Sequence, residues 1–436
     1  MEPDARAPSG NPPLTRSTGS IDRAGLYWSM VGFVVVGVAG LTLNLVITDQ
    51  YGSSILGQFN VLLAIFLIGG QLGSVGMQSA LLFHTPRARS IDHATGPVLA
   101  AALKVNLVSS AVCVAAIVGG AELVLGEVGN EAYRTGLRAI ALGLFLYPIN
   151  KTLLAHINGL GRITLFAIIF ASRYVLLVAM VAGLALLGAD GSTLPWAVTG
   201  AELVLTLVLV ATQLGELRRA RHAVREPELT SRLVRFGIRG MSGGLLLDLN
   251  TRVDVLILGG IAGSGAVGRY SIASIFAEGL YQLAMVSRYS FDPVVAGLFV
   301  EHRIDELRHL VHRSMRRVYL LVVPVGVVTI LVYPLSTSFL FGADLADDTW
   351  QLYALLATGV VLTAGYIPFT NLLQQTGDPT RHSLLLALVS TTNIVLNLLL
   401  VPFLGATGSA IGTAVAQVAL IPYLRRLSRP RVGFAP

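Results

Sequence analysis

The sequence predicts an all-α polytopic membrane protein with about twelve transmembrane helices, arranged as two six-helix lobes (parallel repeats) around a central cavity. The composition is the first indication, because 54% of the 436 residues are hydrophobic and only 13% are charged. Ordinary soluble proteins carry about 25% charged residues. Apolar segments of about 20 residues, each long enough to cross a bilayer as a helix, recur along the chain. An internal repeat then relates its two halves. Soluble fold classes are excluded.

The predicted spans follow one another with short polar connections, which leaves no room for a soluble catalytic domain. They cover residues 26–48, 58–83, 97–121, 136–157, 163–188, 194–214, 236–260, 266–290, 317–341, 350–374, 383–404 and 408–424. An even number of spans places both ends of the chain on the same side of the membrane. The single cysteine, Cys113, lies within an apolar run, so no intramolecular disulfide is expected.

The charged connections alternate in sign and predict the orientation. Arginines concentrate in residues 218–239 and 303–317, whereas the opposite connections carry acids such as Glu127, Asp190 and Asp347. Short loops rich in arginine stay in the cytoplasm. We therefore expect a multi-pass protein of the cytoplasmic (inner) membrane with both termini in the cytoplasm. The arginines are divided among several short segments, so a nucleic-acid partner is not expected.

A repeat divides the predicted spans into two sets of six. Residues 44–61 reappear as residues 255–272, shifted by 211 positions, with Gly57 and Gly268 opening the following span in each copy. Six spans separate the copies, which favours parallel repeats and a site between two lobes. The predicted parts are a disordered cytoplasmic tail, a first lobe, a basic cytoplasmic linker, a second lobe and a basic tail, at residues 1–24, 25–215, 216–232, 233–425 and 426–436.

Several segments carry a family resemblance, of which residues 371–378 are the most specific. The others are residues 51–60, 73–80, 252–259, 268–273, 393–397, 401–405 and 408–414. Together they resemble the polysaccharide (Wzx or O-antigen-type) flippases of the multidrug/oligosaccharidyl-lipid/polysaccharide exporter superfamily. The resemblance implies a V of two lobes that moves a polyprenyl-diphosphate-linked oligosaccharide to the outer leaflet, for cell-surface polysaccharide biosynthesis. It also implies as partners the lipid-linked oligosaccharide, membrane lipids, and polymerase or glycosyltransferase machinery.

Ionisable residues inside apolar spans are the candidate site residues, since each costs about 2.5–3.5 kcal/mol to insert. The basic candidates for substrate binding are Lys151, Arg173, Arg252 and Arg288, and the acidic candidates, for ion coupling or structure, are Glu202, Asp248, Asp254 and Glu278. A guanidinium suits a diphosphate because its planar fork offers paired donors. Asp248 and Arg252 stand four residues apart and can pair on one helix face. Glu278, Gln282 and Arg288 belong to one polar stripe.

Other interpretations stay open for these residues. Asp254 can be structural, Lys151 and Arg288 can reach the interface, and Asn393 with Asn397 can bond another helix rather than a sugar. A cation-coupled multidrug antiporter of the same superfamily is the main alternative, because the intramembrane charges are balanced. No enzyme activity and no cofactor are expected, since no lysine follows a phosphate-loop pattern. The three histidines His302, His309 and His312 lie in a basic, solvated segment, so no metal is expected either.

Overall fold

The computed structural model describes residues 23–90, 95–128, 131–221 and 227–434, and within these ranges the chain forms helices and turns without strands. Most of the predicted N-terminal tail and part of the predicted linker therefore lie outside the described residues. Within the described residues, eight helices are long and apolar enough to cross a membrane, or nine if one bent pair counts as a single span. The prediction of an all-α multi-pass membrane protein is confirmed.

The first half of the chain contains six α-helices and a short 3-10 helix. These are α1 (Arg23–Gly73), α2 (Met77–Ser90), α3 (Gly96–Val128), α4 (Glu131–Gly159), α5 (Ile163–Leu186), η1 (Gly191–Thr193) and α6 (Pro195–Arg221). The long helix α1 has two arms, because Gly52 adopts φ 83° and ψ 165°. These values are open to glycine but strained for residues with a Cβ. The arms correspond to the first two predicted spans.

The predicted span 58–83 does not run unbroken. A turn at residues 74–76 separates α1 from α2, with positive φ at Val75 and Gly76. Within this turn the Ser74 hydroxyl donates to the carbonyl of Gln71. The apolar character of the sequence continues through the turn, so hydropathy gives no sign of it. The helix break rests on local glycine and serine chemistry instead.

The second half contains α7 (Pro227–Val300), α8 (Ile304–Phe341), α9 (Ala343–Thr363), η2 (Ile367–Phe369), α10 (Leu372–Gln375) and α11 (Pro379–Val432). Non-helical glycines again divide the longest helices, Gly263 in α7 and Gly405 in α11. The predicted tenth span bends by 62° between α9 and the η2–α10 segment. The basic segment after residue 425 continues α11 as far as Val432. A helix or helix arm thus lies at each of the twelve predicted spans.

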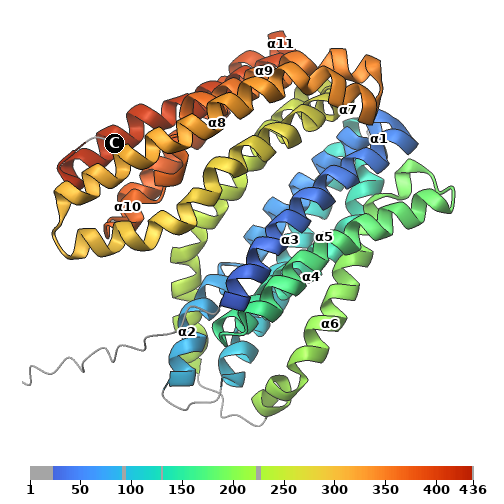
Figure 1. Ribbon diagram of the computed structural model, residues 1–436. Coiled ribbons are helices and arrows are strands. Elements are labelled where there is room, and N and C mark those ends of the chain that lie inside the picture. The colour runs from blue at the N-terminus through green and yellow to red at the C-terminus, as the bar shows by residue number, and fades with distance from the viewer. Residues whose placement is uncertain (1–22, 91–94, 129–130, 222–226, 435–436) are drawn as a thin grey trace, which may run out of the picture.

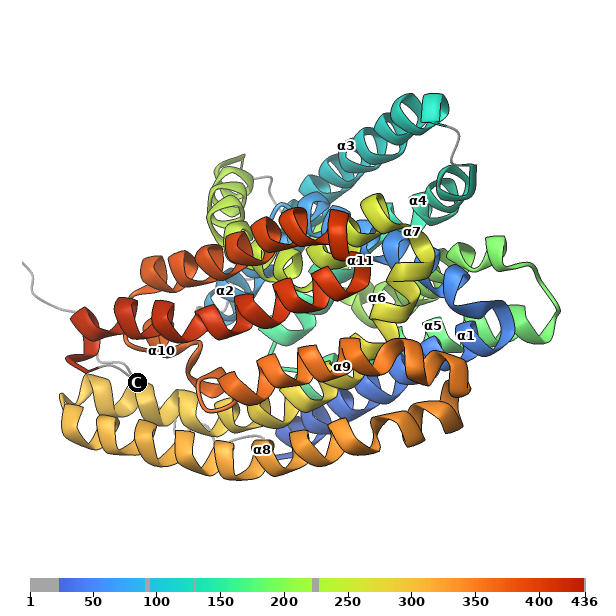
Figure 2. The same ribbon diagram turned by 90° about the horizontal axis from the view of Figure 1, so that it is seen from above.

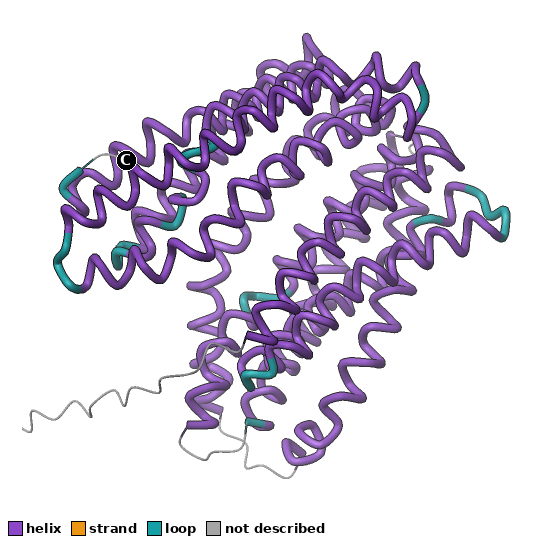
Figure 3. Tube along the Cα trace, viewed as in Figure 1, coloured by secondary structure: helices purple, strands orange, loops and turns teal. Residues whose placement is uncertain are grey.

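The helices form two groups that meet near the labels α1 and α7 and diverge towards the other end (Figure 1). One group holds α1 to α6, and the other holds α8 to α11 with the second arm of α7. Seen from above, α8 lies at the edge of its group (Figure 2). The tube view shows loops mainly at the ends of the helices (Figure 3). The buried apolar residues form four clusters, of which one joins Val61 and Ala64 of α1 to α7, α9 and α11.

The two groups touch through a contact that repeats with the same shift as the sequence. Gly263, 211 positions after Gly52, has φ 80° and ψ 173°, close to the values at Gly52. A Cβ on Gly57 would overlap the carbonyl oxygen of Ser264, and a Cβ on Gly268 would overlap that of Ser53. These two pairs are also related by 211 positions. The sequence repeat is therefore also a repeat of backbone geometry, and we call this contact the pivot.

The first turns of α7 pack on the N-terminal helices rather than on the C-terminal group. Gly76 and Gly237 approach so closely that a Cβ on Gly76 would overlap the Gly237 carbonyl. The rings of Phe83 and Phe236 stack at 4.5 Å, and Leu233 is buried with residues of α2, α3 and α4. Residue 233, the predicted start of the second lobe, thus lies within the first arm of α7, and this part of α7 packs against α2.

Candidate functional site

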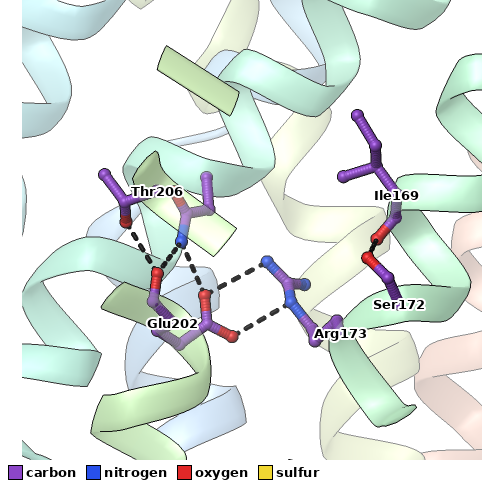
Figure 4. Close-up of polar contacts among 6 residues, drawn as sticks. Ile169, Ser172, Arg173, Glu202 and Thr206 are labelled. Atoms are coloured by element: carbon purple, nitrogen blue, oxygen red, sulfur yellow. Dashed lines mark hydrogen bonds and ion pairs between the residues drawn. The ribbon is translucent and has the colours of Figure 1, made fainter. Parts of the chain in front are cut away.

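Two candidate residues of opposite charge pair inside the N-terminal helices. Arg173 of α5 places Nε 3.0 Å from Oε1 of Glu202 on α6, and its Nη2 lies 3.4 Å from Oε2 (Figure 4). The Arg173 side chain is 12% exposed and that of Glu202 only 2%. The Asn150 amide of α4 also donates to Glu202 Oε2, at 2.8 Å. The buried carboxylate is therefore both charge-paired and hydrogen-bonded, as a buried charge requires.

An aromatic ring links this pair to a second cation. The guanidinium carbon of Arg173 lies 4.6 Å from the ring centroid of Tyr147, and Nζ of Lys151 lies 5.4 Å from the same centroid. Both distances are within the range of cation–π attraction. Lys151 also donates to the side-chain oxygen of Gln71, which accepts from Gln78 at 3.3 Å. We call Arg173 and Lys151, which both lie at this ring, the cation pair on Tyr147.

A proline and a glycine lie next to Tyr147 and shape its surroundings. Pro148 has no N–H, so it cannot donate to the carbonyl of Leu144 one turn earlier. The Asn106 amide of α3 donates to the Pro148 carbonyl at 2.9 Å and ties this part of α4 to α3. Gly70 of α1 faces the ring of Tyr147, where a Cβ would overlap the ring. The glycine lets the ring approach the backbone of α1 and turn its face towards the two cations.

The C-terminal group contains a different polar cluster, which we call the Asp254 cluster. Asp254 of α7 is 7% exposed and accepts hydrogen bonds from the Tyr270 hydroxyl and from the backbone N–H of Val255. The hydroxyls of Tyr270 and Thr413 lie 3.2 Å apart. Asn393 is 3.5 Å from Thr413 and accepts from Asn397 at 2.6 Å. The cluster thus joins both arms of α7 to α11 around one carboxyl group.

The two asparagines act within α11 and across its break. Asn397, in the first arm, accepts from the hydroxyl of Ser409 in the second arm at 2.7 Å, and donates to Asn393 one turn earlier. Both side chains are buried. These contacts hold the arms on either side of Gly405 against each other, which agrees with the interpretation that the asparagines bond a neighbouring helix segment.

The remaining candidates on α7 have separate surroundings. Arg288 lies 3.9 Å from Asp292, which accepts from the Asn371 amide at 3.3 Å. Glu278 is exposed and accepts from Gln282 at 2.6 Å. Arg252 is half-buried and interacts electrostatically with Asp254. The predicted stripe, which also includes Tyr281 and Met285, is thus divided, because these two side chains pack on the apolar core.

The structure therefore brings candidates together in two places, Lys151 with Arg173 and Glu202, and Arg252 with Asp254. Arg288 and Glu278 lie apart from both. The predicted pairing of Asp248 with Arg252 lies outside the described side chains. Sequence reasoning missed Tyr147, Gln71 and Asn150. The spacing of Tyr147 and Lys151, one helical turn apart beside Pro148, is the signal that could have found the ring. Among described residues, no group of three or more metal-ligating side chains is found.

Comparison with known proteins identifies the family. The sequence model of the family described as "Polysaccharide biosynthesis protein" matches residues 31–347. The chain belongs to this family. No curated protein matches the sequence. The resemblance that the sequence carries to polysaccharide flippases is confirmed at this level.

Solved structures show the same fold at low identity. An inward-facing multidrug resistance MATE family transporter of the MOP superfamily is 13% identical, with a TM-score of 0.77 over 93% of this chain and 98% of that one. The lipid II flippase MurJ in an inward closed conformation gives 0.71 at 13% identity, over 92% and 87%. An outward-facing MATE structure gives 0.64 at 16% identity, over 94% and 95%. The chain therefore shares the fold of these transporter structures.

Proposed function

We propose that this protein is a flippase that moves a polyprenyl-diphosphate-linked oligosaccharide across the cytoplasmic membrane by alternating access. The family supports a role in polysaccharide biosynthesis, and the fold supports transport. The observation that carries the substrate class is the cation pair on Tyr147. Two cationic side chains from neighbouring helices meet one aromatic ring within the span region, which suits a diphosphate followed by a sugar. Charge-assisted hydrogen bonds are the strong contacts available to such a head group.

Glu202 has a positioning role in this proposal. It fixes one edge of the Arg173 guanidinium, while the other donors of that group remain to meet a phosphate. A guanidinium has five N–H donors, so one carboxylate does not use them all. Arg252 and Arg288 add positive potential from α7. Asp254, with Asp248 and Glu278 as the other acidic candidates, is the group on which ion coupling would depend.

The movement follows from the two groups of helices. Residues 25–215 and 233–425 would act as the two lobes, with the termini in the cytoplasm and the prenyl tail left in the lipid between them. The pivot joins the lobes at one end, so rocking about it would open the other end. A gradient can drive such a cycle only if the ion or substrate binds the two states with different affinity.

A cation-coupled multidrug antiporter is the second candidate. The MATE-like fold and the buried carboxyl group of Asp254 favour it. The two functions predict different essential residues, since an antiporter for cations would depend on Asp254 and Glu278 and not on the cation pair on Tyr147.

Reconstituted transport distinguishes the two. Proteoliposomes containing the full chain are loaded with a fluorescent undecaprenyl-diphosphate oligosaccharide, and its arrival in the opposite leaflet is measured. Lys151→Gln should lower the rate by about tenfold, the loss expected from one charged hydrogen bond. Lys104→Gln is the matched control, because Lys104 also lies in an apolar helix but its side chain is exposed.

Two outcomes would contradict the flippase proposal. Equal flipping by the wild type and Lys151→Gln, with equal protein in the vesicles, would contradict the proposal that the cation pair on Tyr147 binds the diphosphate. Export of a lipophilic cation by the wild type that is abolished by Asp254→Asn would favour the antiporter.

A further inference from the structure

The peripheral helix α8 carries a groove that belongs to neither polar cluster. It is lined by Arg316, Tyr319, Leu320, Val323 and Pro324, and its lining is apolar apart from the arginine at one end. Leu320 is 67% exposed. The exposed apolar face continues along the helix through Leu331, Leu335 and Phe339, so this side of α8 faces lipid.

The groove has a fixed wall, and a proline lies within its helix. The Tyr319 hydroxyl donates to the Leu362 carbonyl of α9 at 2.8 Å, and its ring packs on Gly365, where a Cβ would overlap it. Pro324 lacks an N–H, so it cannot donate to the carbonyl of Leu320 one turn earlier. The groove therefore lies beside a position where the helix has one backbone hydrogen bond fewer, a feature that membrane helices tolerate.

The end of the groove is strongly basic. Residues 304–316 extend α8 beyond the predicted span as an amphipathic helix, with Leu307, Val311 and Met315 buried in the core. On the opposite side Arg308, Arg313, Arg316 and Arg317 are all exposed. Arg303 differs from them, because Glu301 and Glu306 at 2.8 and 2.7 Å pair with it and raise its pKa above the usual value. The other arginines are therefore the ones oriented to an external anion.

We propose that this groove binds an anionic glycerophospholipid of the leaflet that faces the arginine-rich ends of the helices. The phosphate would meet Arg316, and an acyl chain would lie along Leu320 and Val323, beside the fixed ring of Tyr319. Basic residues at the cytoplasmic surface attract anionic lipid. The apolar groove next to Arg316 distinguishes this place from the other basic helix ends.

The test measures lipids retained by the purified full chain. Protein in mild detergent is mixed with equal amounts of phosphatidylglycerol and phosphatidylcholine, and bound lipid is counted by native mass spectrometry. The wild type should retain phosphatidylglycerol preferentially. Arg316→Ala should reduce this retention by about tenfold, as expected for loss of a charged hydrogen bond. Leu320→Trp should reduce it as well, because it fills the groove without changing charge, and its exposed position leaves folding intact.

Arg429→Ala is the control, since Arg429 is exposed at the basic end of α11 and the groove on α8 does not include it. This variant should retain phosphatidylglycerol like the wild type. The proposal is wrong if Arg429→Ala loses as much lipid as Arg316→Ala, which would indicate attraction by overall charge. It is also wrong if Leu320→Trp retains the lipid, or if phosphatidylcholine binds equally well. None of these outcomes depends on the flippase proposal.

Discussion

The two halves of this protein share their backbone at the pivot and differ in their polar interiors. At the pivot, Gly57 meets Ser264 as Gly268 meets Ser53. In the interiors, the N-terminal helices hold two opposite charges, Arg173 and Glu202, whereas the described C-terminal cluster holds one carboxyl group among hydroxyls and amides. At the pivot, both copies of the repeat need glycine, because neither Gly57 nor Gly268 has space for a side chain. The interiors are free of that constraint and have acquired different chemistry.

This difference predicts different responses to the loss of a charge. A buried pair that loses one member leaves the other charge unpaired, which is strongly destabilising. Neutralising Asp254 is different, because its hydrogen bonds come from a hydroxyl and a backbone N–H and the nearby Arg252 is half-buried, so no fully buried charge is left behind. The comparison can therefore be tested with substitutions in each half and at the pivot that the halves share.

The largest effect is expected for Arg173→Ala. It leaves the Glu202 carboxylate buried without its ion-pair partner, and breaking a buried pair costs about 3–5 kcal/mol. The free energy of unfolding, measured by denaturant titration in detergent, should fall by that amount. The double variant Arg173→Ala/Glu202→Gln should recover a substantial part of the loss. If the double variant is no more stable than the single one, the charge pair is not what stabilises this region.

A smaller effect is expected at the pivot. Gly57→Ala forces the two helix arms apart, because its Cβ would overlap backbone rather than a movable side chain. Overpacking of this kind should lower the free energy of unfolding by about 1–3 kcal/mol. If the pivot closes one side of the transporter, the flipping rate should also fall in the fraction of protein that stays folded. Gly268→Ala should reproduce the result, since the contact is repeated.

Gly37→Ala serves as the control in the same helix. No atom lies within 4 Å of the added Cβ at that position, and alanine is favoured over glycine in helices. This variant should match or exceed the wild type in stability. A Gly57 variant that behaves like the Gly37 variant would show that the close contact is not maintained in the membrane.

The sequence predicted the repeat that underlies the pivot better than it predicted the site. The repeat and its glycine turns can be recognised along the chain, and the positive φ at Gly52 and Gly263 is a local property of the backbone. The pairing of Arg173 with Glu202 joins residues 29 positions apart on different helices. Only the packing of α4, α5 and α6 decides that pairing. For the same reason the sequence could place Tyr147 on a helix but could not place it between two cations.

The segment with the most specific resemblance shows the same limit. Residues 371–378 carry the most specific part of the family resemblance, and in the structure their contacts form a turn at the start of α11. Asp378 accepts from the N–H of Arg381 at 3.0 Å and caps α11, and Arg431 donates to the Thr376 carbonyl at 2.9 and 2.6 Å. A motif can be typical of a family because it shapes a turn, and sequence alone does not separate that reason from substrate contact.

A moderate effect is expected for Tyr270→Phe in the C-terminal helices. The substitution keeps the ring and removes the hydroxyl that donates to Asp254. Loss of a hydrogen bond to a charged acceptor costs about 1.5–3 kcal/mol. The free energy of unfolding, measured by the same denaturant titration, should fall by less than it does for Arg173→Ala. An equal or larger decrease would mean that the two interiors do not differ as the comparison states.

The smallest effect on stability is expected for Asp254→Asn. The amide retains an oxygen that can accept from the Val255 N–H, and the neutral side chain no longer bears the penalty of a buried charge. We therefore expect the free energy of unfolding to change by about 1 kcal/mol or less, because a neutral hydrogen bond contributes only about that much. Transport is the decisive second measurement. A stable Asp254→Asn protein that flips lipid-linked oligosaccharide but no longer responds to an imposed proton or sodium gradient would assign ion coupling to the C-terminal interior. Unchanged coupling would leave Asp254 as a residue that holds the arms of α7 to α11, and a loss of stability like that of Arg173→Ala would refute the contrast between the halves.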